Sequence, residues 1–419
     1  MEEVSPPDME KKSPPTGGER FAWADLFKGV AIIFVVLIHV LGRYLSLYRA
    51  GSAPWYTVSI THCIVDCAVP CFIFLSAFLN TISLLRRPDP LRFYRSRLQT
   101  ILLPYLIWSA VYIALQFVIH PDAFTWTKAL HQVLVGKAYE HLYFLWILLQ
   151  LLLIMPWITP LFKKRPPFLM LLGVALALAV VYKAINLLWL LPWPEFNRSA
   201  LRFIIIISMG MWLGANSQRL RDILSRGLWI ILIAAIGGAA LSFPSTIQEH
   251  QADSLRAVRS REAKLAASAK SQTISNVNQH NNNSIKKALT PVKSLAMTSH
   301  KVLAKRPQSI KMRYLRSLRN DIGYWLYTIG AAFLLMTLCS RWKRKDAGTR
   351  MMELLGKYSL QIYLVHPIIL LTLDYIHIID LAGKSAAFVC YVTLSLALPV
   401  FLAYLLEKIR IAQFIFGRA

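Results

Sequence analysis

A lysine and a histidine share one face of the first apolar segment of the chain. Residues 21–43 read FAWADLFKGVAIIFVVLIHVLGR, with Asp25 and Lys28 near the start and His39 near the end. Lys28 and His39 are eleven residues apart, so they lie about 20° apart around a helix and roughly 16 Å apart along its axis. Ionisable groups inside a membrane are costly and usually functional. The spacing therefore predicts a cation at one membrane face and an imidazole towards the other.

Histidines and carboxylates recur at a similar depth in other apolar segments. They are His62 with Asp66, His141 with Glu140, and His366 with Ser359 and Tyr363 on one helical stripe. A carboxylate beside an imidazole orients the ring and stabilises the imidazolium that forms when a hydroxyl proton is taken. Several such groups in the outer halves of different helices predict a polar cavity that is suited to general base chemistry.

The segments that carry these residues are typical of a polytopic α-helical membrane protein. Hydrophobic residues make up 56% of the 419 residues, and the mean hydropathy is +0.47. The apolar blocks are about twenty residues long, the length of a membrane-spanning helix. The expected fold is all-α, a transmembrane bundle of about ten spans. They are predicted at residues 21–42, 57–80, 99–119, 141–162, 167–191, 200–216, 227–244, 321–340, 354–374 and 384–406.

Basic residues in the short connections predict the orientation of the bundle. Lys and Arg concentrate in alternate connections, for example at 86–97 and 341–350, and such residues favour the cytoplasmic side. Both termini are therefore expected in the cytoplasm. Five parts follow: a disordered cytoplasmic N-terminus at 1–20, spans one to seven in 21–244, an extracytoplasmic loop at 245–320, spans eight to ten in 321–406, and a cytoplasmic tail at 407–419.

The loop at 245–320 is basic and of low complexity. It holds 15 Lys and Arg against three acidic residues, so it supplies about 12 of the 26 net positive charges without indicating a nucleic-acid partner. Its composition predicts a largely disordered segment, except for a short basic interfacial helix at KMRYLRSLRN. The loop is either a tolerated linker or a binding element for an anionic surface polymer or lipid headgroups.

The five cysteines are interpreted as packing residues. Cys63, Cys67 and Cys71 recur every four residues in one span, and no second ligand cluster has the spacing of a metal site. The chain also lacks a P-loop, a GxGxxG, an HExxH and a GxSxG motif. No metal is therefore expected.

Five short motifs, in order along nearly all the spans, resemble the membrane acyltransferases of acyltransferase family 3. The first is a basic residue, ten residues and a histidine, here Lys28 to His39. The others are VPCFIFLSA at 69–77, LPYLIWS at 103–109, HLYFL at 141–145 and SLQIYLVHP at 359–367. Ala77 stands where the family pattern has glycine.

The resemblance implies transfer of an acyl group, with acetyl expected, from a cytoplasmic coenzyme A donor to a hydroxyl of a glycan or surface polymer at the other face. It makes His39 the leading catalytic residue. Acyl-CoA would be a donor co-substrate, and no bound cofactor is expected. The chain would be a multi-pass protein of the cell membrane, in contact with the lipid bilayer, and its oligomeric state is left open.

On this hypothesis His39 acts as general base on the acceptor hydroxyl or carries the acyl group transiently. The other roles are Glu140, His141 and His366 lining the acceptor side, Asp66 as orienting carboxylate, Lys28, Arg95 and Arg97 holding the donor phosphates, and Tyr143, Ser359 and Tyr363 contacting substrate.

Two other functions fit the same features. A secondary transporter or polysaccharide exporter could use the His and carboxylate cavity as a proton relay, although no inverted repeat is visible. A non-catalytic membrane partner could use the 245–320 loop to recruit an anionic polymer.

Overall fold

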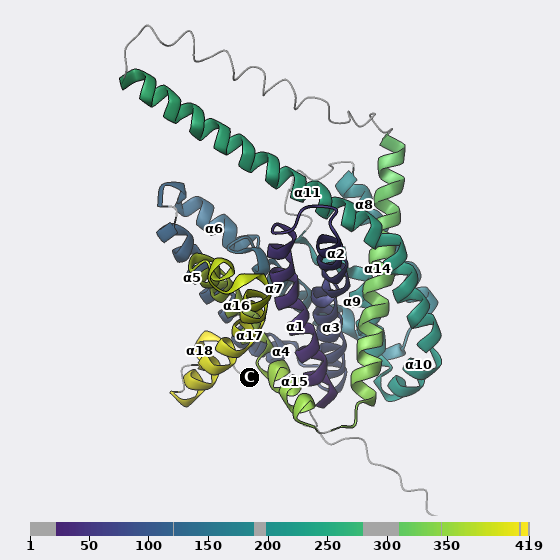
Figure 1. The fold of residues 1–419 in the computed structure, drawn as a ribbon. Helices are drawn as coiled ribbons and strands as arrows, with labels where there is room; N and C mark the ends of the chain where they lie inside the picture. The colour runs from purple at the N-terminus through teal and green to yellow at the C-terminus, as the bar shows by residue number, and fades with distance from the viewer. Residues whose placement is uncertain are drawn as a thin grey trace, which may run out of the picture.

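The computed structural model describes residues 22–119, 121–187, 198–279, 310–344, 346–409 and 412–417, and in these ranges the secondary structure consists of helices joined by short connections, without strands. The helices are α1 (Ala22–Leu45), α2 (Ala53–Val65), α3 (Ala68–Arg86), α4 (Pro90–Arg97), α5 (Leu103–Ile119), α6 (Trp126–Leu134), α7 (Tyr143–Ile158), α8 (Phe168–Leu187), α9 (Ile204–Ala215), α10 (Leu220–Arg226), α11 (Leu228–Gln279), α14 (Ile310–Arg341), α15 (Ala347–Lys357), α16 (Ser359–Tyr375), α17 (Ile378–Lys408) and α18 (Ala412–Ile415) (Figure 1). The predicted all-α fold is confirmed.

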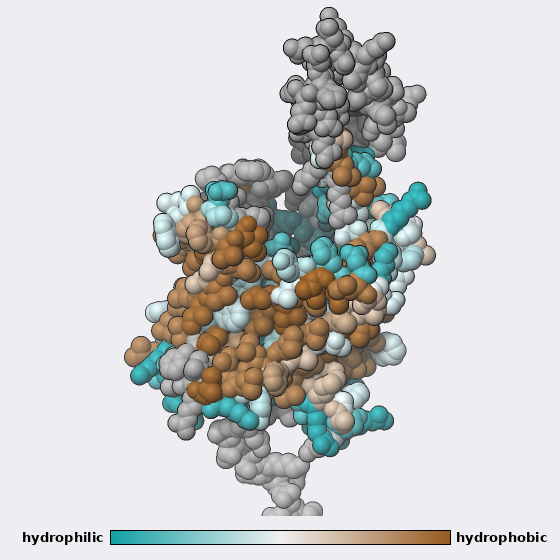
Figure 2. All heavy atoms as spheres, turned by 60° about the vertical axis from the view of Figure 1, so that its left-hand side comes forward, coloured by the Kyte–Doolittle hydropathy of each residue, from teal (hydrophilic) through white to brown (hydrophobic). Residues whose placement is uncertain are grey.

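Eight helices or helix pairs in the described ranges are long and apolar enough to cross a membrane, and two bent pairs raise the number to ten if each counts as one span. Figure 2 shows a broad apolar band across one face of the bundle, with hydrophilic residues gathered towards its two ends. Large apolar side chains such as Leu153 and Trp157 on α7 are 65% and 76% exposed. Such exposure is expected where lipid rather than water surrounds a helix.

The ninth predicted span is not one straight helix. The prediction ran through 354–374, but α15 and α16 meet at an angle of 81°. Residues 354–357 therefore belong to the separate helix α15. Asp346 caps the start of α15, accepting hydrogen bonds from the backbone and hydroxyl of Thr349, and these bonds hold the pKa of its carboxyl below the usual range.

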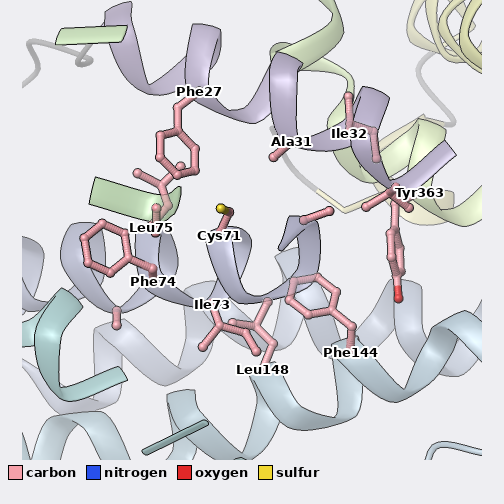
Figure 3. Packing of buried hydrophobic residues seen from close by; sticks show 14 of the residues in the cluster. Phe27, Ala31, Ile32, Cys71, Ile73, Phe74, Leu75, Phe144, Leu148 and Tyr363 are labelled. Atoms are coloured by element: carbon pink, nitrogen blue, oxygen red, sulfur yellow. The ribbon is translucent and has the colours of Figure 1, made fainter. Parts of the chain in front are cut away.

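α3 packs against α1 on one side and against α7 on another, in the centre of the bundle. Phe27 and Ile32 on α1 and Cys71 and Phe74 on α3 are fully buried (Figure 3). The cysteine lies among apolar side chains, in agreement with the packing role predicted from the sequence.

Glycine allows α9 to approach α3 closely. A Cβ added at Gly210 would come within 2.5 Å of the Phe74 carbonyl oxygen, and one at Gly214 within 2.7 Å of the Phe78 carbonyl oxygen. Two small residues four apart are a common way for membrane helices to bring their backbones together.

The predicted disorder of 245–320 is wrong for the parts that the structure describes. α11 continues as a helix to Gln279 and runs out past the end of the bundle, while α14 begins at Ile310 and includes the basic stretch predicted to be helical (Figure 1). The stretch 245–279 is rich in Ala, Arg and Lys, which favour helix. A helix that extends an existing span also avoids the cost of nucleation. Residues 280–309 and the N-terminal 1–20 segment lie outside the described residues.

The end of the predicted tail packs back onto the bundle. The Phe416 ring is 2% exposed and stacks on Trp108 of α5, with ring centroids 5.9 Å apart. The Trp108 indole N–H donates to the Ile415 carbonyl oxygen at 3.2 Å. This contact fixes the start of α5 against the C-terminal residues.

Candidate active site

Three imidazoles from three helical elements meet inside the bundle. His39 lies on α1, His141 on the short helix η3 (Glu140–Leu142) that precedes α7, and His366 on α16. The ring centroids of His39 and His366 are 5.2 Å apart, and those of His141 and His366 are 5.7 Å apart. His141 and His366 are 3% and 0% exposed, whereas His39 is partly exposed. One accessible imidazole is thus backed by two buried ones, all three predicted from the sequence as catalytic residues.

The hydrogen bonding of His366 defines its tautomer. Its Nδ1 lies 2.9 Å from the Ile362 carbonyl oxygen, one turn earlier on α16. A carbonyl oxygen only accepts, so Nδ1 carries the proton and the neutral ring presents Nε2 as an acceptor. That Nε2 is buried and has no hydrogen-bond partner among the described residues, and neither ring nitrogen of His141 has one. The Nε2 of His366 and one of the two ring nitrogens of His141 can therefore accept a hydrogen bond.

A collar of tyrosines holds His141 in place. The ring centroids of Tyr112, Tyr139 and Tyr363 lie 5.1, 5.4 and 5.1 Å from that of His141. Tyr112 also stacks on Tyr139 at 4.4 Å and donates to the Leu364 carbonyl oxygen at 2.7 Å. Burial raises the pKa of Tyr139, which lies before the span, so its phenol remains protonated at neutral pH.

An arginine and an aspartate lie beside the imidazoles at the C-terminal end of α1, and neither was predicted to belong to the site. Arg43, one turn after His39 on α1, donates from Nη1 to the His39 carbonyl oxygen at 3.0 Å and from Nε to Asp374 at 2.9 Å. Asp374 also accepts from the Tyr391 hydroxyl at 2.6 Å. The ion pair therefore links α1 to α16 and α17 beside the imidazoles. The sequence feature that could have indicated these two residues is their spacing: Arg43 is four residues after His39, and Asp374 is eight residues after His366.

A second pair of histidines lies beside the first cluster. The ring centroids of His62 on α2 and His250 on α11 are 4.8 Å apart, and His250 Nδ1 is 2.8 Å from the Ser59 hydroxyl. His39 interacts electrostatically with His62. One turn further along α11, Ser254 accepts from the Trp55 indole at 3.3 Å. The extended part of α11 is thus held against α2 near the C-terminal end of α1.

The two predicted carboxylates lie outside the imidazole cluster. Asp66 follows the end of α2, at the break before α3, and it interacts electrostatically with Arg202 and with Tyr143. Glu140 opens η3 with an exposed side chain next to Tyr139. The groups closest to the three imidazoles are therefore aromatic rings and each other, rather than these two acids.

The three predicted substrate contacts have different surroundings. Tyr363 lies in the cluster, but its hydroxyl donates to the His141 carbonyl oxygen, so its role there is to hold the backbone. Ser359 is buried at the start of α16, seven residues and roughly 10 Å of helix before His366. Tyr143 interacts electrostatically with Asp66, which lies outside the imidazole cluster.

The three basic residues predicted to hold the donor phosphates have different surroundings. Lys28 forms an ion pair with Asp25 at 2.6 Å. Arg95 is exposed on α4. Arg97 lies over the Phe93 ring at 5.2 Å, and its buried Nε has no hydrogen-bond partner among the described residues. Arg97 precedes a π-helical turn, η1 (Leu98–Leu102), a rare distortion that often marks functional sites.

The cluster as a whole can take a proton from a hydroxyl group. A partly exposed imidazole accepts the proton, and a neighbouring imidazole with a free acceptor nitrogen can share it. The rings are held by backbone hydrogen bonds and by the collar, which limits reorganisation during a reaction.

Comparison with known proteins gives one match. The family model described as an acyltransferase domain, acyltransferase 3, matches residues 21–406. No curated protein and no solved structure matches the chain. The match covers every predicted span and includes His39, His141 and His366, and the chain therefore belongs to acyltransferase family 3 and is a membrane acyltransferase.

Proposed function

We propose that this membrane acyltransferase moves an acetyl group from cytoplasmic acetyl-CoA to a hydroxyl of an extracytoplasmic glycan or surface polymer. The observation that supports this best is the partly exposed imidazole of His39, backed by the buried rings of His366 and His141. In this proposal the protein lies in the cell membrane with both termini in the cytoplasm. The imidazoles then lie towards the side from which an external acceptor enters.

His39 acts as the general base in this reaction. Its ring nitrogen takes the proton of the acceptor hydroxyl while the hydroxyl oxygen attacks the thioester carbonyl carbon. The new C–O bond forms, the C–S bond breaks, and the coenzyme A thiolate leaves and takes up a proton. The Nε2 of His366 accepts a hydrogen bond from the imidazolium of His39, because its own proton is held on Nδ1 by the Ile362 carbonyl oxygen. His366 thus takes the orienting role first assigned to Asp66.

The donor phosphates are held at the cytoplasmic end. Of the three predicted cations, Arg97 is the best candidate for binding the phosphates, because its buried Nε lacks a partner among the described residues. Lys28 is already paired with Asp25. An arginine guanidinium offers several donors in a planar arrangement that matches phosphate oxygens. Because His39 is far from this end along α1, the extended arm of coenzyme A would have to reach between them.

The experiment uses the purified chain in lipid nanodiscs with labelled acetyl-CoA and glycan isolated from the cells in which the protein occurs. Wild-type protein should release coenzyme A thiol and form labelled ester. His39→Ala should lose about 10²–10⁴-fold of the rate, the usual contribution of general base catalysis. The matched control is His131→Ala, an exposed histidine on α6, which should keep the wild-type rate.

Ester formation at the wild-type rate by folded His39→Ala protein would contradict the proposal. Proton flux into liposomes without any acyl donor, together with no ester, would instead favour a transporter.

A further inference from the structure

A cavity of about 210 Å³ opens between α5 and α6, near the C-terminal end of α5. The two helices lie side by side at the edge of the bundle (Figure 1). The lining residues are Ile113, Gln116, Phe117, Phe124, Thr125, Lys128, Ala129 and Gln132. The cavity is smaller than the roughly 300–1,000 Å³ of pockets for drug-sized ligands, so it suits a group of about one ring.

The lining combines an aromatic wall with polar amides. Phe117 and Phe124 pack edge to face with ring centroids 5.1 Å apart. The Gln132 side-chain amide donates to that of Gln116 at 3.4 Å, and the Thr125 hydroxyl caps α6 nearby. A sugar ring has the complementary surface, with C–H groups on its faces and hydroxyl groups around its edge. A lipid tail would match the two rings but not the polar side chains of Gln116, Thr125 and Gln132 in the same lining.

The cavity is joined to the imidazole cluster through α5. Tyr112, which contacts His141, immediately precedes the lining residue Ile113 and lies one turn before Gln116. Gln116 also donates from Nε2 to the Ala138 carbonyl oxygen at 2.6 Å, so it holds the segment that leads into His141. An occupant of the cavity therefore lies against the elements that position the cluster.

One face of α6 lines the cavity, and the opposite face is exposed on the surface of the bundle. Trp126 and Leu130 are 82% and 62% exposed, whereas Ala129 is 7% exposed and faces the cavity. An exposed apolar stripe with a tryptophan is typical of a helix that lies in the membrane interface. The cavity is then reached from the interface, on the side of the external acceptor.

We propose that this cavity is an acceptor subsite that binds one sugar ring of a glycan, while a neighbouring unit presents its hydroxyl to His39. The inference rests on the proposed function, because it names the class of acceptor as a saccharide chain and places one of its units.

The test fills the cavity without touching the imidazoles. Ala129→Trp places an indole in the space, and Leu130→Trp, on the lipid-exposed stripe of the same helix, is the matched control. The probe is a set of oligosaccharides released from the surface glycan of the producing cells, titrated calorimetrically into the full chain in nanodiscs without acetyl-CoA. Ala129→Trp should weaken binding about tenfold or more, and Leu130→Trp should bind as the wild type does.

Binding and transfer separate the two proposals. Oligosaccharide binding by Ala129→Trp equal to that of the wild type, or no binding by the wild type, overturns the subsite. If ester formation does not depend on His39, the proposed function is overturned. The oligosaccharide-binding result is then judged separately. If Ala129→Trp does not fold, Gln132→Leu removes an amide from the same wall and should weaken binding with unchanged acetyl-CoA affinity. Unchanged oligosaccharide binding by this variant also overturns the subsite.

Discussion

Replacing Gly29 by alanine tests how closely α1, the helix that carries His39, packs against α15. A Cβ at Gly29 would collide with backbone atoms of Met352, and one at Gly356 would collide with backbone atoms of Asp25. The two helices therefore touch backbone to backbone. No side-chain rotation can relieve the collision, so the helices must move apart.

The size of the effect follows from two opposing terms. Overpacking a close contact costs about 1–3 kcal/mol, while alanine is favoured over glycine inside a helix by about 1 kcal/mol. Gly29→Ala should therefore lower the free energy of unfolding by about 0–2 kcal/mol. Gly42→Ala, in the same helix and with nothing within 4 Å of the added Cβ, has only the favourable term. The difference between the two variants isolates the collision at about 1–3 kcal/mol.

The assay is thermal unfolding of both variants in the same detergent, followed by intrinsic fluorescence. Gly29→Ala should unfold at a temperature lower than Gly42→Ala by about 2 °C or more. Equal midpoints, or a higher midpoint for Gly29→Ala, would refute the close packing of α1 on α15.

Three further predictions concern the site itself. His366→Gln removes the acceptor nitrogen and should lower kcat by about tenfold or more with little change in the KM for acetyl-CoA; an unchanged kcat would exclude a role in sharing the proton. Arg43→Gln and Asp374→Asn should each reduce activity, and the double variant should lose less than the sum of the two, as a double-mutant cycle can measure; additive losses would mean that the ion pair does not act as a unit. His250→Ala should free the extended part of α11, seen as faster hydrogen exchange after residue 254, whereas Ser59→Ala should produce the same change more weakly; unaltered exchange would show that the contact does not hold the helix.

The overall fold could be predicted because lipid imposes a simple rule on the sequence. Each span must be a continuous apolar helix, so about ten blocks of hydrophobic residues predict about ten spans. The prediction erred where a helix ends without a change in composition. Residues 354–357 are apolar enough to extend the ninth span, but the chain bends by 81° after Lys357, and only the packing of α15 on α1 determines where that bend lies.

The level of the imidazole cluster along the helix axes could be predicted from the sequence. Which residues belong to the cluster could be predicted only in part. Residue depth follows from position along a span, and it correctly places His39, His141 and His366 at one level. Rotation about the helix axis is set by tertiary packing, and a break in a helix changes it. Asp66 stands at such a break, between Val65 and Ala68, and it interacts electrostatically with Arg202 rather than with an imidazole.

Long-range partners could not be inferred from local spacing. Arg43 and Asp374 are 331 residues apart, so no periodicity connects them. Their contact depends on which ends of α1 and α16 meet.

The measurement that tests the central claim most directly follows labelled acetyl across the membrane. Inside-out vesicles with the wild-type chain, or with His39→Ala at equal expression, receive labelled acetyl-CoA at the cytoplasmic face. We predict that label reaches glycan inside the vesicles only when His39 is intact. Equal labelling of the glycan by the two chains would contradict the role of His39 in transferring the acetyl group.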